Sequence, residues 1–131
     1  MAREHPQPSD AEWKVLHALW RKQKATAREL LGSLAGERWA YTTLKTMLSR
    51  MEEKGLVRST KVGNVASYEP LIEQERAERD AVRTLLQRVF EGASGPLLAH
   101  LAAEESVSAA DRRTLLERAR EAGRKDGNRG R

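Results

Sequence analysis

The stretch that decides the fold is residues 40–56, AYTTLKTMLSRMEEKGL. At the period of an α-helix its apolar side chains share one face, because they recur three, four and seven positions apart. These side chains are Leu44, Met47, Leu48 and Met51. The opposite face is hydroxyl-bearing and cationic, and Gly55 then favours the end of the helix. This pattern is typical of a helix that packs on a small core and binds DNA, although a solvated amphipathic helix has it too.

The polar face of this helix contains the residue types that bind duplex DNA. Hydroxyls can bond phosphates or base edges, and an arginine can form two hydrogen bonds to guanine. We therefore predict that Lys45 and Arg50 make the ionic contacts with DNA. The remaining contacts of the helix are predicted for Tyr41, Thr42, Thr43, Thr46 and Ser49.

Two capping boxes precede this helix and predict two further helices. Ser9-Asp10-Ala11-Glu12 opens a helix to about Lys22, and Thr26-Ala27-Arg28-Glu29 opens a helix that ends near Gly36. The second and third helices are joined by a short turn, which is the order of a helix-turn-helix motif. Thr26 and Arg28 are predicted to meet the DNA backbone, because free amides at a helix start favour phosphate.

A hairpin is predicted directly after the motif. Residues 57–70, VRSTKVGNVASYEP, contain two short strand patterns around Gly63-Asn64, a turn that hairpins favour. A helix-turn-helix followed by a hairpin is the winged-helix arrangement. Arg58 and Lys61 would give this wing a cationic edge for phosphates.

Three more helices are predicted in the C-terminal part of the chain. They run from Glu73 to about Glu91, from Leu97 to about Glu104, and from the N-cap Ser108 to Gly123. About 50 residues cannot bury so much apolar side chain alone, so we predict a two-fold homodimer. The alternative is that these helices fold back on the winged module. Dimer contacts are predicted for Val82, Leu85, Leu86, Val89, Phe90, Leu97, Leu98, Leu101, Leu115 and Leu116.

The chain as a whole is therefore predicted to be mainly α-helical. Residues 1–8 are a flexible arm, 9–71 a winged-helix DNA-binding domain with a two-stranded wing, 72–123 a helical dimerisation region, and 124–131 a disordered basic tail. The net charge of +5 is concentrated in residues 1–70 and in the tail, which favours a polyanionic partner. No apolar run is long enough for a membrane span and no signal peptide is evident, so a cytoplasmic protein without membrane insertion is expected.

The sequence offers little for catalysis or cofactor binding. It has no cysteine, which excludes disulfides, thiolate zinc sites and cysteine nucleophiles. No Gly-rich phosphate loop or His-x-x-x-His motif is present, and His5, His17 and His100 are scattered. We therefore predict no enzyme activity, no metal site and no cofactor.

Four strings together carry a resemblance to a known family. They are Ser9-Asp10-Ala11-Glu12-Trp13, residues 25–29 (ATARE), residues 39–57 (WAYTTLKTMLSRMEEKGLV), and Tyr68-Glu69-Pro70-Leu71. On these residues the chain resembles the penicillinase-repressor (BlaI/MecI) family of bacterial winged-helix repressors, closely over 9–71 and more weakly to about residue 120.

The resemblance implies a dimeric repressor that binds an inverted-repeat operator through its winged helix. It also implies dimerisation through the C-terminal helices, and release, often, when a partner membrane sensor protease leads to cleavage in that region. The family's recognition-helix positions correspond to Thr42, Thr43, Lys45, Thr46 and Arg50.

Two other classes of function remain open at this point. One is a winged helix used for protein–protein contact, which would expose apolar or acidic residues on the helix of residues 40–56. The other is a repressor that responds to a small molecule, which would need a pocket with converging polar groups.

Overall fold

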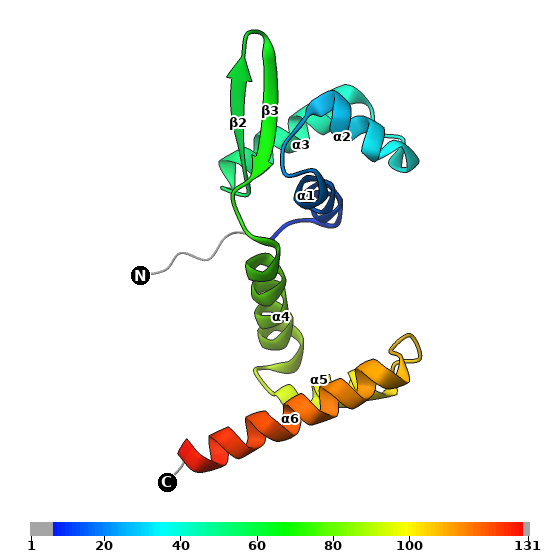
Figure 1. The fold of residues 1–131 in the computed structure, drawn as a ribbon, viewed down its shortest axis with the longest axis vertical. Coiled ribbons are helices and arrows are strands. Elements are labelled where there is room, and N and C mark those ends of the chain that lie inside the picture. The colour runs from blue at the N-terminus through cyan, green and yellow to red at the C-terminus, as the bar shows by residue number, and fades with distance from the viewer. Residues whose placement is uncertain (1–6, 130–131) are drawn as a thin grey trace. The chain divides into compact units, whose positions relative to one another are not determined.

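The computed structural model describes residues 7–129, with side chains described as far as residue 122. It divides into two compact units, Met1–Arg83 and Thr84–Arg131. In chain order the elements are α1 (Asp10–Lys22), β1 (Ala25–Thr26), α2 (Ala27–Ser33), the 3₁₀ helix η1 (Ala35–Glu37), α3 (Tyr41–Glu53), β2 (Val57–Val62), β3 (Val65–Pro70), α4 (Gln74–Phe90), α5 (Ser94–Ala103) and α6 (Ala109–Arg129). Figure 1 shows the β2–β3 hairpin beside helices α1–α3, which confirms the predicted winged helix.

Both predicted capping boxes are present. The Ser9 hydroxyl accepts a hydrogen bond from the Glu12 amide at 3.2 Å, and the Glu12 carboxylate accepts one from the Ser9 amide at 2.9 Å. Thr26 and Glu29 make the same reciprocal pair at the start of α2. These bonds satisfy amides that have no partner within the helix, so they define where α1 and α2 begin.

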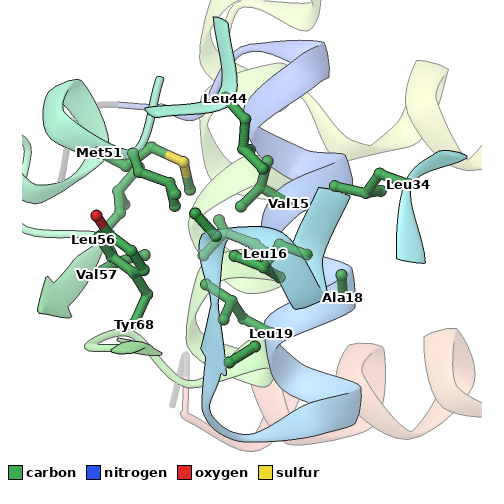
Figure 2. Close-up of a cluster of buried hydrophobic side chains, with 14 of the residues drawn as sticks. Val15, Leu16, Ala18, Leu19, Leu34, Leu44, Met51, Leu56, Val57 and Tyr68 are labelled. Atoms are coloured by element: carbon green, nitrogen blue, oxygen red, sulfur yellow. The ribbon is translucent and has the colours of Figure 1, made fainter. Parts of the chain in front are cut away.

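The core of the first unit forms where α1, α2, α3 and the sheet meet. The apolar face of α3 is confirmed, because Leu44, Leu48 and Met51 are fully buried and Met47 is half-buried. Figure 2 shows Leu44 and Met51 of α3 directed toward Val15 and Leu16 of α1. The opposite face of α3 is consequently left on the surface. The three tryptophans, Trp13, Trp20 and Trp39, are partly buried against this core.

The sheet has three antiparallel strands in the order β1-β3-β2. The hairpin matches the prediction, with Val62 opposite Val65 and Gly63 in the turn at a φ of 64°. β1 was not predicted, because two residues are too short to show a strand period. It pairs Ala25 with Tyr68 and therefore makes β3 the central strand.

Two predictions about the C-terminal helices were wrong. α5 begins at Ser94 rather than Leu97. Pro96 is tolerated in its first turn because amides there have no helical partner. α6 does not stop at Gly123 but continues to Arg129, since a glycine costs a helix only about 1 kcal/mol. The predicted tail is thus helical as far as residue 129, and its last two residues lie outside the described part.

The N-cap Ser108 is confirmed, because its hydroxyl accepts a bond from the Asp111 amide at 3.0 Å. The predicted arm falls outside the described residues except for Gln7 and Pro8. The expected boundary between residues 71 and 72 stays a prediction. No helix among the described residues is both long and apolar enough to cross a bilayer.

Candidate nucleic-acid interface

The polar face of α3 lies on the surface of the winged-helix unit. Five of the predicted DNA contacts are exposed on this helix, and Tyr41 at its first turn is 38% exposed. The five are Thr42, Thr43, Thr46, Ser49 and Arg50. No acidic residue occurs within residues 41–51, so nothing on this part of the helix repels a phosphate.

An open cleft runs between the start of α1 and this face of α3. Its lining includes the N-cap residue Ser9 and Glu12 of α1. From α3 it includes Thr42, Thr46 and Arg50. The exposed polar face of α3 (Thr42, Thr43, Thr46, Ser49 and Arg50), here called the recognition face, is therefore not flat. Its hydroxyl and guanidinium groups border a groove on the side toward α1.

Lys45 differs from its neighbours because it is only partly exposed. Its Nζ atom donates a hydrogen bond to the Tyr68 hydroxyl at 2.9 Å and lies 5.5 Å from the centroid of the Tyr68 ring. The hydrogen bond to Tyr68 raises the pKa of Lys45 above its ordinary value, and the nearby Tyr68 phenol adds to this effect. Both effects favour the charged form of Lys45.

The start of α2 contributes a second cation to the same region. The Arg28 guanidinium carbon lies 5.1 Å from the centroid of the Tyr41 ring, so α2 and α3 are joined by a cation–π contact. The Thr26 hydroxyl already has a partner within α2, because it accepts a hydrogen bond from the Glu29 amide at 3.2 Å. The Glu29 carboxylate also lies at this helix start, the position predicted to meet a DNA phosphate.

The two cations of the wing are in different situations. Arg58 forms an ion pair with Glu69, its cross-strand neighbour, and the hydrogen bond from Arg58 lowers the pKa of Glu69. Lys61 is exposed near the tip, and no ion pair to it occurs within residues 7–122. Lys61 is therefore the wing cation whose charge is available to a phosphate.

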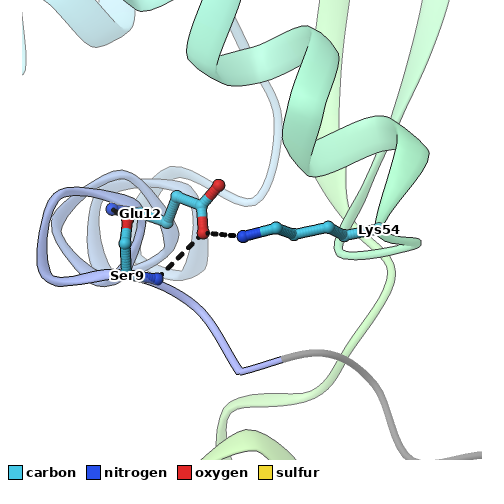
Figure 3. A network of polar contacts seen from close by, with 3 residues as sticks. All are labelled: Ser9, Glu12 and Lys54. Carbon is cyan, nitrogen blue, oxygen red and sulfur yellow. Dashed lines mark hydrogen bonds and ion pairs between the residues drawn. The ribbon is translucent and has the colours of Figure 1, made fainter.

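A partly buried ion pair joins the end of α3 to the start of α1. Figure 3 shows Lys54 reaching the Glu12 carboxylate, with Nζ and Oε1 2.6 Å apart. Burial alone would raise the pKa of Glu12, but the hydrogen bonds from Lys54 and Ser9 outweigh it, so the pKa is lowered. The Glu12 side chain is only 5% exposed, and the pair therefore locks α3 against α1.

Sequence reasoning missed the residues that hold the recognition face in place. Glu12 was explained by its capping box, but its second partner, Lys54, lies 42 residues away and no local pattern indicates it. Glu52 accepts bonds from the amide and hydroxyl of Ser59, which join α3 to β2. Tyr68 had a weak signal, because a tyrosine within a strand pattern brings a hydroxyl that needs a partner when buried.

The residues predicted for dimerisation lie on α4, α5 and α6. Val82, Leu85, Val89, Leu101 and Leu116 are exposed large hydrophobic residues, with Val89 62% and Leu116 49% exposed. The other members are half-buried: Leu86, Phe90, Leu97, Leu98 and Leu115. No described side chain of residues 84–122 is buried, so the second unit lacks a dry core of its own.

No group of three or more potential metal-ligating side chains occurs in the part of the chain that the structure describes.

Comparison with known proteins gives concordant matches. The sequence model of the family described as penicillinase repressor matches residues 8–121. The methicillin resistance regulatory protein MecI of Mammaliicoccus sciuri is 25% identical over 101 residues, which cover 76% of this chain and 82% of that protein. The penicillinase repressor of Bacillus licheniformis is 27% identical over 104 residues, covering 79% and 81%.

The winged-helix unit is also similar to a solved structure. The solution structure of the DNA-binding domain of the repressor BlaI aligns with a TM-score of 0.50 and 32% sequence identity. The alignment covers 57% of this chain and 93% of that domain. The similarity in structure therefore concerns the DNA-binding part.

Proposed function

Because the chain belongs to the penicillinase repressor family, we propose that it represses transcription by binding an inverted-repeat DNA operator as a homodimer until a signal releases it. The observation that supports this most directly is the exposed face of α3, where residues 41–51 include hydroxyl and cationic side chains and no acidic residue.

In the proposed complex α3 lies in the major groove. Its 13 residues span about 20 Å at the α-helical rise, and the groove admits one such helix. Thr42, Thr46 and Ser49 would bond base edges or phosphates through their hydroxyls. Arg50 is exposed on the same face and would make the ionic contact that depends most on sequence, because its guanidinium can form two hydrogen bonds to one guanine.

The surrounding cations would hold the phosphate backbone. Lys45 lies on α3 itself, Arg28 of α2 contacts Tyr41 of α3, and Lys61 extends this positive surface onto the wing. Arg58 would contribute less, because Glu69 already neutralises it. Such contacts set the position of the helix on the duplex and make binding depend on salt.

Dimerisation through the second unit would place two recognition helices on the two halves of the operator. The exposed apolar side chains of α4, α5 and α6 support this, because a second copy would remove them from water. The family resemblance implies release through a membrane sensor protease system. We propose that a system of this kind supplies the releasing signal for this chain.

The experiment that tests the function is fluorescence anisotropy of the full chain on the DNA upstream of its own gene. A scrambled duplex of equal length is the control, and both are measured at about 50 and 200 mM salt, where phosphate contacts weaken steeply. Preference for the upstream DNA that survives the higher salt is the expected result. Equal and salt-abolished binding to both duplexes contradicts sequence-specific repression at this site. Absence of binding to either favours a protein-contact function of the winged helix.

A further inference from the structure

The ammonium group of Lys45 is held before any DNA is present. Its Nζ donates to the Tyr68 hydroxyl over 2.9 Å and stands 5.5 Å from the centre of the tyrosine ring. An ammonium has three N–H donors, so two remain for phosphate oxygens. The hydrogen bond to Tyr68 therefore orients the Lys45 ammonium and still leaves it able to bind an anion.

Tyr68 is in turn one of the most firmly placed residues of the first unit. It lies on the central strand β3, opposite Ala25 of β1 and Ser59 of β2. Its side chain is 5% exposed and its ring belongs to the hydrophobic core. The hydroxyl that meets Lys45 is thus fixed by two strand pairings and by core packing.

This arrangement contrasts with the ordinary behaviour of a lysine on a surface helix. A lysine has a flexible four-carbon stem, and ordering such a side chain on binding reduces affinity. Lys61 on the wing is exposed and has no ion-pair partner within residues 7–122, so it offers a comparison within the same molecule.

We propose that Tyr68 is a positioning residue for DNA binding, which holds the Lys45 ammonium at the junction of α3 and the wing so that it meets an operator phosphate already ordered. This inference rests on the proposed DNA-binding function. It adds that the wing contributes to affinity through the base of β3 as well as through Lys61 near its tip.

The first test needs no DNA. The mobility of the lysine ammonium groups is measured by nitrogen-15 NMR in the free full-length chain, with the Lys45 and Lys61 signals assigned from the Lys45→Arg and Lys61→Arg spectra. The Lys45 ammonium is expected to be clearly more ordered than that of Lys61. Equal mobility overturns the proposal, whatever the protein binds.

The second test is a double-mutant cycle on operator affinity. Tyr68→Phe keeps the buried ring and removes the hydroxyl, so it is expected to weaken binding roughly three- to tenfold. Lys45→Ala is expected to weaken binding further and to lower the salt slope by about 0.9, the value for one phosphate contact. In the Lys45→Ala background, Tyr68→Phe should have no additional effect.

A matched control separates positioning from general support of the wing. Ser59→Ala removes another hydroxyl bond between α3 and the wing, the one to Glu52, without touching a cation. Its operator affinity is expected to stay within about twofold of the parent. Equal losses from Tyr68→Phe in both backgrounds, or no loss in either, overturn the proposal. A parent chain that binds no operator would refute the proposed function instead, and the NMR comparison would still decide whether Tyr68 orders Lys45.

Discussion

The two units of this chain differ in how far they bury their apolar side chains. In the winged-helix unit α1, α2, α3 and the sheet enclose a core of fully buried side chains, among them Leu16, Leu30 and Leu48. In the second unit no described side chain of residues 84–122 is buried, and Leu85, Val89 and Leu116 are exposed.

The difference indicates that the two parts acquire stability differently. The first unit has a dry core and two capped helix starts. Its free energy of unfolding should therefore not depend on the second unit or on a partner chain. The second unit exposes apolar side chains whose removal from water requires another surface. We propose that a second copy of the chain supplies that surface.

The substitution expected to have the largest effect is Leu85→Glu in the second unit. A two-fold interface would contain this change twice, so it should cost about 4 kcal/mol or more, which is ~1,000-fold in the dimer Kd. Sedimentation analysis of the full chain measures this. The control is Gln87→Glu, which adds the same charge on the opposite side of α4. An unchanged dimer in Leu85→Glu would place the interface elsewhere.

A smaller effect is expected from truncating a leucine in the first unit. Leu48→Ala should lower the free energy of unfolding by about 2–5 kcal/mol, because Leu48 is fully buried. All three tryptophans pack on this core, so tryptophan fluorescence during urea unfolding follows this unit. Leu116→Ala makes the same chemical change in the second unit and should leave that transition unchanged. Equal losses in both variants would mean that the units unfold together.

Glu12→Gln tests the ion pair that joins α1 to α3. It should cost about 1.5–3 kcal/mol at neutral pH, the range for hydrogen bonds to charged groups. The folded pKa of Glu12 lies below its unfolded value of 4.5. Its contribution is therefore present above pH 4.5 and is lost as the pH falls through the folded pKa. Urea unfolding of both proteins between neutral and acidic pH measures the difference, which should shrink below pH 4.5.

The exposed ion pair between Lys14 and Glu37 is the control for this measurement. Its side chains are 50% and 32% exposed, so Glu37→Gln should cost less than about 1 kcal/mol. If Glu12→Gln cost no more than Glu37→Gln, the pair with Lys54 would not lock α3.

Apart from the controls, Arg50→Ala is expected to have the smallest effect, and this effect is on DNA binding rather than on folding. Operator affinity should fall by about 1–3 kcal/mol and base preference should relax, while the dimer and the stability stay unchanged. Anisotropy on operator variants measures both. Arg79→Ala is the control, because Arg79 is on α4 and pairs with Glu75. Parent-like affinity and preference in Arg50→Ala would remove Arg50 from the interface.

Much of the first unit was predictable because its signals are local. Capping boxes, the helical period of Leu44, Leu48 and Met51, and the Gly63 turn each act over a few residues, and the structure contains all of them. The polar face of α3 followed from the same period. Where local signals were weak, prediction failed, as at the two-residue strand β1 and at the ends of α5 and α6.

The sequence by itself therefore determined the helices and hairpin of the winged unit, the exposed face of α3 and the family of the chain. Only the tertiary structure decided which charged side chains around that face are paired with other residues and which remain available to bind DNA. It places the Tyr68 hydroxyl beside Lys45, pairs Arg58 with Glu69, and brings Lys54 to Glu12. These contacts join residues 11 to 42 positions apart. No local period encodes them, because they depend on how whole elements pack.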